Sequence, residues 1–121
     1  MTNTIELPQK VIDGIFDTDK IPPGSYSVVV KKLTNQMNRV TAVYVVQDEG
    51  DYKDKVIFES FNLEYEVGQK MFREFLDAVG LLPQSGSFDL DTVIGQTLSV
   101  SVKHKEDNGK VFVNVTNHMP F

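Results

Sequence analysis

Residues 24–61 read GSYSVVVKKLTNQMNRVTAVYVVQDEGDYKDKVIFESF, and this stretch decides the fold. It contains three runs rich in β-branched and aromatic residues, at 26–33, 40–46 and 56–61, separated by polar turn-forming residues. Such runs, bounded by Asn, Asp and Gly, are typical of β-strands. In the first run Tyr26, Val28 and Val30 alternate with more polar residues, so one face of that strand is expected in the core. The stretch therefore predicts three consecutive strands.

One helix and two further strands are expected downstream. Residues 69–79 predict an amphipathic helix whose apolar stripe consists of Met71, Phe72, Phe75, Leu76 and Val79. Two alternating strands, 97–103 and 110–115, are joined by Asn108-Gly109, a pair that favours the positive φ angles of a type I′ turn. This element order predicts a mainly β fold, a five-stranded barrel of the oligonucleotide/oligosaccharide-binding (OB) type with one α-helix between strands 3 and 4.

The length of 121 residues and the 40% hydrophobic content fit one domain with a single core. We expect one OB-like domain over 1–121, with an N-terminal arm at 1–23, the barrel at 24–116 and a C-terminal tail at 117–121. The spacing of Val11, Ile12, Ile15 and Phe16 fits either a helical turn or an extended arm. Because the chain has no cysteine, packing alone must hold it together, without disulfides or thiolate metal sites.

The formal net charge of −5 argues at first against a nucleic-acid binder, whose affinity draws on counterion release. The charge is, however, unevenly distributed. Residues 62–96 carry six acids against two bases, whereas 24–61 carry five of each sign. A local basic surface on the strands is therefore compatible with the acidic total.

The sequence predicts neither a membrane protein nor a secreted one. No segment approaches the roughly 18 consecutive apolar residues of a membrane span, and residues 1–10 lack the features of a secretory signal. We therefore expect a cytoplasmic protein with no membrane partner.

Enzymatic motifs are absent from the sequence. His104 and His118 are not in a metal-ligand spacing, and neither a phosphate-binding glycine loop nor a nucleophile elbow occurs. The remaining enzymatic alternative is a hydrolase that uses Asp89 and Asp91, a carboxylate pair that holds a metal only when further acids converge. We expect no catalysis, no metal and no cofactor.

Binding of a single nucleic-acid strand requires cations for the phosphates and flat side chains that stack on bases. Tyr44 is less suited to stacking because it is in phase with the apolar residues of its strand, whereas Phe112 faces away from the neighbouring valines. The candidate cations on or beside predicted strands are Lys31, Lys32, Arg39, Lys53, Lys55, Lys103, Lys105 and Lys110. The candidate stacking residues are Tyr52, Phe61, Tyr65 and Phe112.

Several short motifs resemble one family. They are IPPGSY at 21–26, EGDYKDKVIF at 49–58, FNL at 61–63, VGL at 79–81 and IGQ at 94–96. Together they look like the small phage-encoded single-stranded-DNA-binding proteins, formerly a domain of unknown function, over about residues 21–115. The resemblance implies an OB-type barrel that binds and protects single-stranded DNA without sequence preference during phage replication or recombination. It also implies a location in the host cell cytoplasm.

Residues 117–121 are relevant to possible protein partners. Proteins that coat single strands often end in a run of acids closed by a hydrophobic residue, but residues 117–121 read NHMPF, without an acidic run. One hypothesis is that Phe121 recruits replication or recombination proteins, and the other is that this segment is a strand end packed on the barrel.

A different class of function stays open. The second strand is apolar on both faces, and Val43 and Val45 make homo-oligomerisation a hypothesis. The alternative to DNA binding is a protein–protein adaptor or virion-associated β-barrel module without nucleic-acid binding, whose acidic surface would meet a basic partner.

Overall fold

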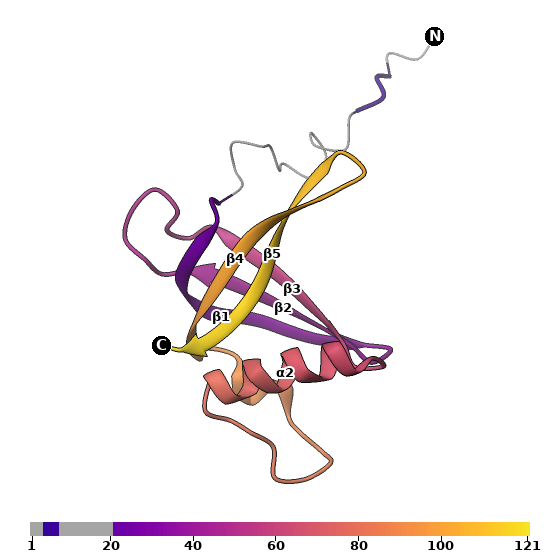
Figure 1. Cartoon of the computed structure of the whole chain (residues 1–121), viewed down its shortest axis with the longest axis vertical. Coiled ribbons are helices and arrows are strands. Elements are labelled where there is room, and N and C mark those ends of the chain that lie inside the picture. The colour runs from indigo at the N-terminus through magenta and orange to yellow at the C-terminus, as the bar shows by residue number, and fades with distance from the viewer. Residues whose placement is uncertain (1–3, 8–20) are drawn as a thin grey trace.

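The computed structural model describes residues 4–7 and 21–121 (Figure 1). The elements in chain order are β1 (Gly24–Gln36), β2 (Arg39–Val46), β3 (Val56–Asn62), α2 (Glu66–Ala78), the 3-10 helix η2 (Leu90–Val93), β4 (Thr97–Asp107) and β5 (Lys110–Pro120). The predicted mainly β fold, with five strands and an α-helix between the third and the fourth, is confirmed. The choice between a helical and an extended arm at 11–16 lies outside the described residues.

All five strands belong to one antiparallel sheet in the order β3-β2-β1-β4-β5. The central strand β1 pairs with β4 through its first half and with β2 through its second half. Figure 1 shows β4 and β5 crossing in front of the other three strands, with α2 below them. Among the described residues β3 and β5 are the edges, with no backbone pairing between them, so the closed OB-type barrel stays a prediction.

Two irregularities bend the sheet. In β1 the pairing with β2 shifts between Val30 and Lys32, which leaves Lys31 as the extra residue. Between β4 and β5 the shift falls at Ser101 and Val102, and Thr116 is the extra residue on β5. An extra residue in one strand increases the local twist. The two bulges therefore help a five-stranded sheet to curve around one core.

Both long hairpins turn on residues with positive φ. Asn108 and Gly109 have φ angles of 52° and 77°, as the sequence predicted. The turn between β1 and β2 is made in the same way by Met37 and Asn38, with φ angles of 51° and 63°. Positive φ at both central positions matches the right-handed twist of the flanking strands.

Helix α2 packs one face on the sheet and begins three residues before the predicted start at 69. It buries Phe75, Leu76 and Ala78, and the rings of Phe61 and Phe75 lie 5.4 Å apart. The helix can start this close to β3 because Gly68 has no side chain: a Cβ there would lie 2.0 Å from the carbonyl oxygen of Asn62. The helix ends at Ala78, and Gly80 follows with φ 74°, as expected for a glycine just past a helix end.

Strand β5 continues to Pro120, whereas the sequence placed the end of the barrel at 116 and a tail at 117–121. The bulge at Thr116 shifts the alternation, so that Val115 and His118 are both buried. A strict period of two does not predict this shift. Among the described residues, Phe121 comes directly after the strand.

Candidate functional site

The side of β1, β2 and β3 that faces away from the core carries a regular set of side chains. Residues opposite each other in register lie on the same face of a sheet. We call this set the three-strand face, and its cross-strand rows are Val29–Val45–Val56, Lys32–Val43–Phe58, Thr34–Thr41–Ser60 and Gln36–Arg39–Asn62. The face is bounded at one end by the β1–β2 turn and at the other by the β2–β3 connection.

The exposed ring of this face is Phe58, which is 59% exposed. The predicted stacking residue of the same strand, Phe61, is wrong: it is 1% exposed and packs its ring against Phe72 at 5.2 Å. The two residues lie on opposite faces because side chains alternate along a strand. The sequence could not choose between the phases, since Val56 and Phe58 form one apolar pair and Ile57 and Phe61 the other.

Two cations and no acid lie on the three-strand face. Lys32 is opposite Val43, and Arg39 is opposite Asn62. Both side chains are exposed, and neither forms an ion pair within residues 4–7 and 21–121. The local charge of this face is therefore positive although the chain is anionic. Lys31, the other predicted cation of β1, is exposed at the bulge.

The β4–β5 hairpin carries a second group of predicted residues. Phe112 is 50% exposed and lies opposite Lys105, while Lys103 lies opposite Asn114. The prediction that Phe112 faces outward is thus confirmed. Lys110 follows the turn at Gly109 and is also exposed. A ring and a cation are therefore direct cross-strand neighbours on this hairpin, whereas on the three-strand face Lys32 and Phe58 share a row with Val43 between them.

The β2–β3 connection holds the third group of predicted site residues. In this loop acidic side chains lie close to the cations. Lys53 forms a salt bridge with Glu49 at 2.7 Å, and the ring of Tyr52 packs edge-on against Tyr26 at 6.5 Å. Partial burial, Tyr52 and the carboxylate of Asp48 together raise the pKa of Tyr26. Lys55 is half-buried. The acids of this loop lower its attraction for phosphate.

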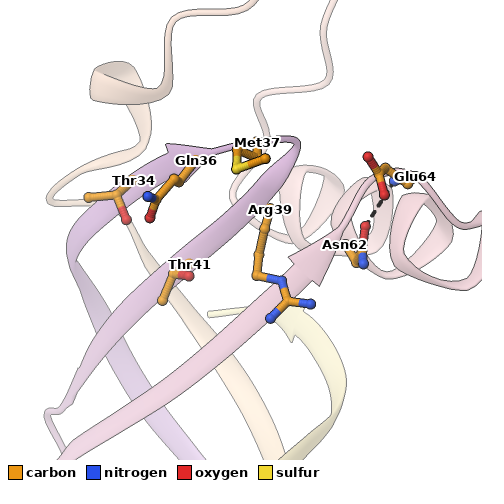
Figure 2. A pocket seen from close by; sticks show the side chains of 7 residues that line it. All are labelled: Thr34, Gln36, Met37, Arg39, Thr41, Asn62 and Glu64. Atoms are coloured by element: carbon orange, nitrogen blue, oxygen red, sulfur yellow. Dashed lines mark hydrogen bonds between the residues drawn. The ribbon is translucent and has the colours of Figure 1, made fainter.

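A pocket of about 370 Å³ opens at the β1–β2 turn and is lined by residues of the last two rows of the three-strand face (Figure 2). Figure 2 shows side chains from both strands of the hairpin and from the end of β3 around it, with the guanidinium of Arg39 beside Asn62. The lining residues are Thr34, Gln36, Met37, Arg39, Thr41, Asn62 and Glu64. Asn62 Oδ1 accepts a hydrogen bond from the backbone N–H of Glu64 at 3.1 Å.

A buried polar cluster, which the sequence did not predict, lies on the core side. Nε2 of His118 is 2.7 Å from Oε1 of Glu59, and Nδ1 is 2.9 Å from Oε1 of Glu74. Tyr44 donates its hydroxyl to Glu59 at 2.7 Å. Burial alone lowers the pKa of His118, but the hydrogen bonds and charges of Glu59 and Glu74 outweigh it, so that the pKa is raised. Burial, with Glu59 beside the hydroxyl, raises the pKa of Tyr44.

Of the carboxylate pair Asp89 and Asp91, the side chain of Asp89 bonds the backbone. Asp89 caps η2 by accepting a hydrogen bond from the N–H of Asp91 at 3.0 Å. Among the described residues, no group of three or more His, Asp or Glu side chains is placed to hold a metal ion. In the same part of the chain no helix has the length and apolarity needed to cross a membrane.

The fold and the face define a class: a mainly β domain in which a curved antiparallel sheet, packed on one helix, presents an aromatic ring and cations on its outer side. The chain belongs to the family described as "Protein of unknown function (DUF669)", whose model matches residues 10–121. No curated protein matches the chain significantly.

Proposed function

We propose that this protein binds single-stranded DNA without strong sequence preference and protects it during phage replication or recombination, in the host cell cytoplasm. The observation that carries the proposal is the row Lys32–Val43–Phe58, which puts a cation and an exposed flat ring on one face of the sheet. A phosphate and its base require this pairing of groups, because binders of single strands combine charge along the backbone with stacking on bases.

The strand arrangement supports an OB-type barrel. The edge strands β3 and β5 are joined by the contact between Glu59 and His118 in place of backbone pairing. The OB-fold is a partly open five-stranded barrel that binds oligonucleotides on its strand 2–3 face and on the loops between strands 1 and 2 and strands 4 and 5. In this chain those places are the three-strand face, the turn at Met37 and the hairpin with Phe112. This support is an analogy of fold.

In the proposed mechanism, aromatic side chains stack on the bases and cationic side chains contact the phosphates. Bases stack on Phe58 and Phe112, each at about 1 to 3 kcal/mol. The phosphates contact the cations of the same two surfaces, Lys31, Lys32, Arg39, Lys103, Lys105 and Lys110. The acids of the β2–β3 loop weaken the contribution of Lys53 and Lys55, the two other cations that the sequence predicts for the site.

A fluorescence anisotropy titration with a mixed-sequence oligonucleotide at low salt tests the proposal. Phe58→Ala should weaken binding by roughly 1 to 3 kcal/mol, because it removes the stacking surface. Phe121→Ala is the matched control, since Phe121 is 74% exposed but lies outside both surfaces, and its affinity should equal that of the unchanged protein. Absence of binding by the unchanged protein would defeat the proposal.

The second part of the proposal is that Phe121 recruits replication or recombination proteins. Its ring is exposed directly after β5 and is free to enter an apolar pocket of a partner. Deletion of Phe121 should abolish partner binding and leave DNA binding unchanged. If every partner interaction survives the deletion, this part of the proposal fails.

One observation favours a second function. The row Val29–Val45–Val56 is apolar throughout, and Val56 is exposed. Such a row suits a protein–protein adaptor or a virion-associated module, or the contact between copies of this chain. Native mass spectrometry with and without oligonucleotide separates the two functions: a DNA complex supports the first, and a constant oligomer that ignores DNA supports the second.

A further inference from the structure

The pocket at the β1–β2 turn contains both a cation and an anion. Arg39 and Glu64 line it together, and neither forms an ion pair among the residues that the structure describes. Two amides and two hydroxyls, from Gln36, Asn62, Thr34 and Thr41, complete the polar lining. Its volume of about 370 Å³ lies within the usual range of small-ligand pockets, roughly 300 to 1,000 Å³. The pocket therefore suits a small ligand with hydrogen-bonding edges.

The carboxylate of Glu64 decides what kind of group fits. A phosphate would be attracted by Arg39 but repelled by Glu64. A neutral group that presents acceptors on one side and donors on another satisfies both side chains. A nucleobase is such a group, and single-stranded bases are free to present these edges to a protein.

Guanine matches this pair of charges. Its N7 and O6 are adjacent acceptors, the usual partners of an Arg fork. Its N1–H and N2 amino group are adjacent donors, which fit the two oxygens of a carboxylate. Adenine offers a donor beside N7, so it does not suit the Arg fork. Thymine has one donor, N3–H, and cytosine has one donor group, the N4 amino group, so each gives the two oxygens of Glu64 fewer adjacent donors than guanine does.

The rim of the pocket offers an apolar contact for the face of a base. Met37 is 88% exposed and is held at φ 51°, a conformation that non-glycine residues rarely adopt. A thioether also packs favourably against an aromatic ring.

We infer that this pocket binds one guanine base of the DNA strand, with Arg39 donating to O6 and N7 and Glu64 accepting from N1–H and N2–H. The inference rests on the proposed function and adds a base preference at one position of an otherwise unselective track. Under this inference Arg39 recognises a base edge, and the phosphate contacts of the three-strand face are left to Lys31 and Lys32.

The test compares oligothymidylates that carry one central guanine, inosine or 7-deazaguanine with the plain oligothymidylate. Inosine lacks the N2 amino group, and 7-deazaguanine lacks the N7 acceptor. We expect the guanine strand to bind about ten-fold more tightly than the plain strand, and each analogue to lose most of that gain.

Paired variants assign each contact. Glu64→Gln should bind guanine and inosine strands equally while still preferring guanine over 7-deazaguanine. Arg39→Lys keeps the charge but loses the planar fork, so it should lose the preference for N7. Glu66→Gln is the matched control, an exposed acid outside the pocket that pairs with Lys70 at 3.3 Å, and it should preserve every preference.

The outcomes separate this inference from the function on which it rests. If no oligothymidylate binds, the proposed function fails. If the plain strand binds and the guanine strand binds no better, the guanine pocket is wrong and the proposed function stands. A guanine preference that survives Glu64→Gln and Arg39→Lys also overturns the assignment.

Discussion

Nε2 of His118 lies 2.7 Å from Oε1 of Glu59, and this contact joins the two edge strands of the sheet, which no backbone pairing connects within the described residues. Both side chains are inaccessible or nearly so, at 0% and 8% exposure. The same imidazole binds Glu74 of α2, so that one side chain ties β5 to β3 and to the helix. His118 thus acts as a polar cross-link where the sheet is open.

Removal of this cross-link should destabilise the domain. At a pH below the raised pKa of His118, His118→Ala leaves the buried carboxylate of Glu59 without its charged partner, and breaking a buried pair in this way costs about 3 to 5 kcal/mol. Urea unfolding followed by circular dichroism measures the loss. His104→Ala is the control, because within the described part of the chain its imidazole makes one hydrogen bond, to the carbonyl of Ile21 at 2.7 Å, and its loss should cost no more than about 1.5 kcal/mol. Equal losses for the two variants would contradict the cross-link.

The stability of the domain should fall as the pH rises through the pKa of folded His118. Because that pKa is raised above the ordinary value of 6.5, the folded protein holds the proton more tightly than the unfolded chain. The contribution of His118 is therefore complete below pH 6.5 and is lost as the pH passes the raised value. Urea midpoints between pH 6 and pH 9 check this, and His118→Asn should remove the fall. A midpoint that rises over this interval and is unaffected by His118→Asn would exclude the effect.

Gly68→Ala should weaken the packing of α2 on β3. The added Cβ would meet the carbonyl oxygen of Asn62 at 2.0 Å, so that the helix start must move. Overpacking of this kind costs about 1 to 3 kcal/mol, visible as a lower melting temperature. Gly86→Ala is the control, since a Cβ there has no heavy atom within 4 Å, and its melting temperature should stay close to that of the unchanged protein.

The salt dependence of DNA binding should identify the lysines that contact phosphate. Lys32→Ala should reduce the magnitude of the log-log slope of affinity against salt by about 0.7, the value for one phosphate of a single strand. Lys53→Ala should change the slope less, because Lys53 is already paired with Glu49 at 2.7 Å. Anisotropy titrations at several salt concentrations measure both slopes. A larger change for Lys53 would move the phosphate track to the β2–β3 loop.

Met37→Asn should stabilise the β1–β2 hairpin. Asn tolerates the left-handed conformation that Met37 adopts at φ 51°, and the relief is worth up to about 1 kcal/mol. Thermal unfolding measures the gain, with Met119→Asn in β5 as a control that should show none. If Met37 packs on a base, the stabilised variant should also bind the guanine strand more weakly. A loss of stability in Met37→Asn would mean that the methionine packs on the domain itself.

Local sequence features predicted the five strands and the helix α2, but not the 3-10 helix η2. Alternating β-branched residues marked the strands, and Asn108-Gly109 marked the hairpin, because these signals depend on neighbours in the chain. The outward orientation of the Phe112 side chain followed from the same alternation. The orientations of Phe58 and Phe61 did not follow from it. Each face of β3 carries two apolar residues, and the inner face also carries the acidic Glu59.

The sequence by itself thus determined the number of strands, their order along the chain, the position of the helix and the turn at Asn108-Gly109. All of these depend on residues a few positions apart. Tertiary structure decided which ring of β3 is exposed, that β5 extends to Pro120, and that Arg39 and Glu64 share a pocket. It also decided the role of His118, whose partners are 44 and 59 positions away. The physical reason is that charges and rings distant in the chain meet only after the sheet has curved and α2 has packed on it.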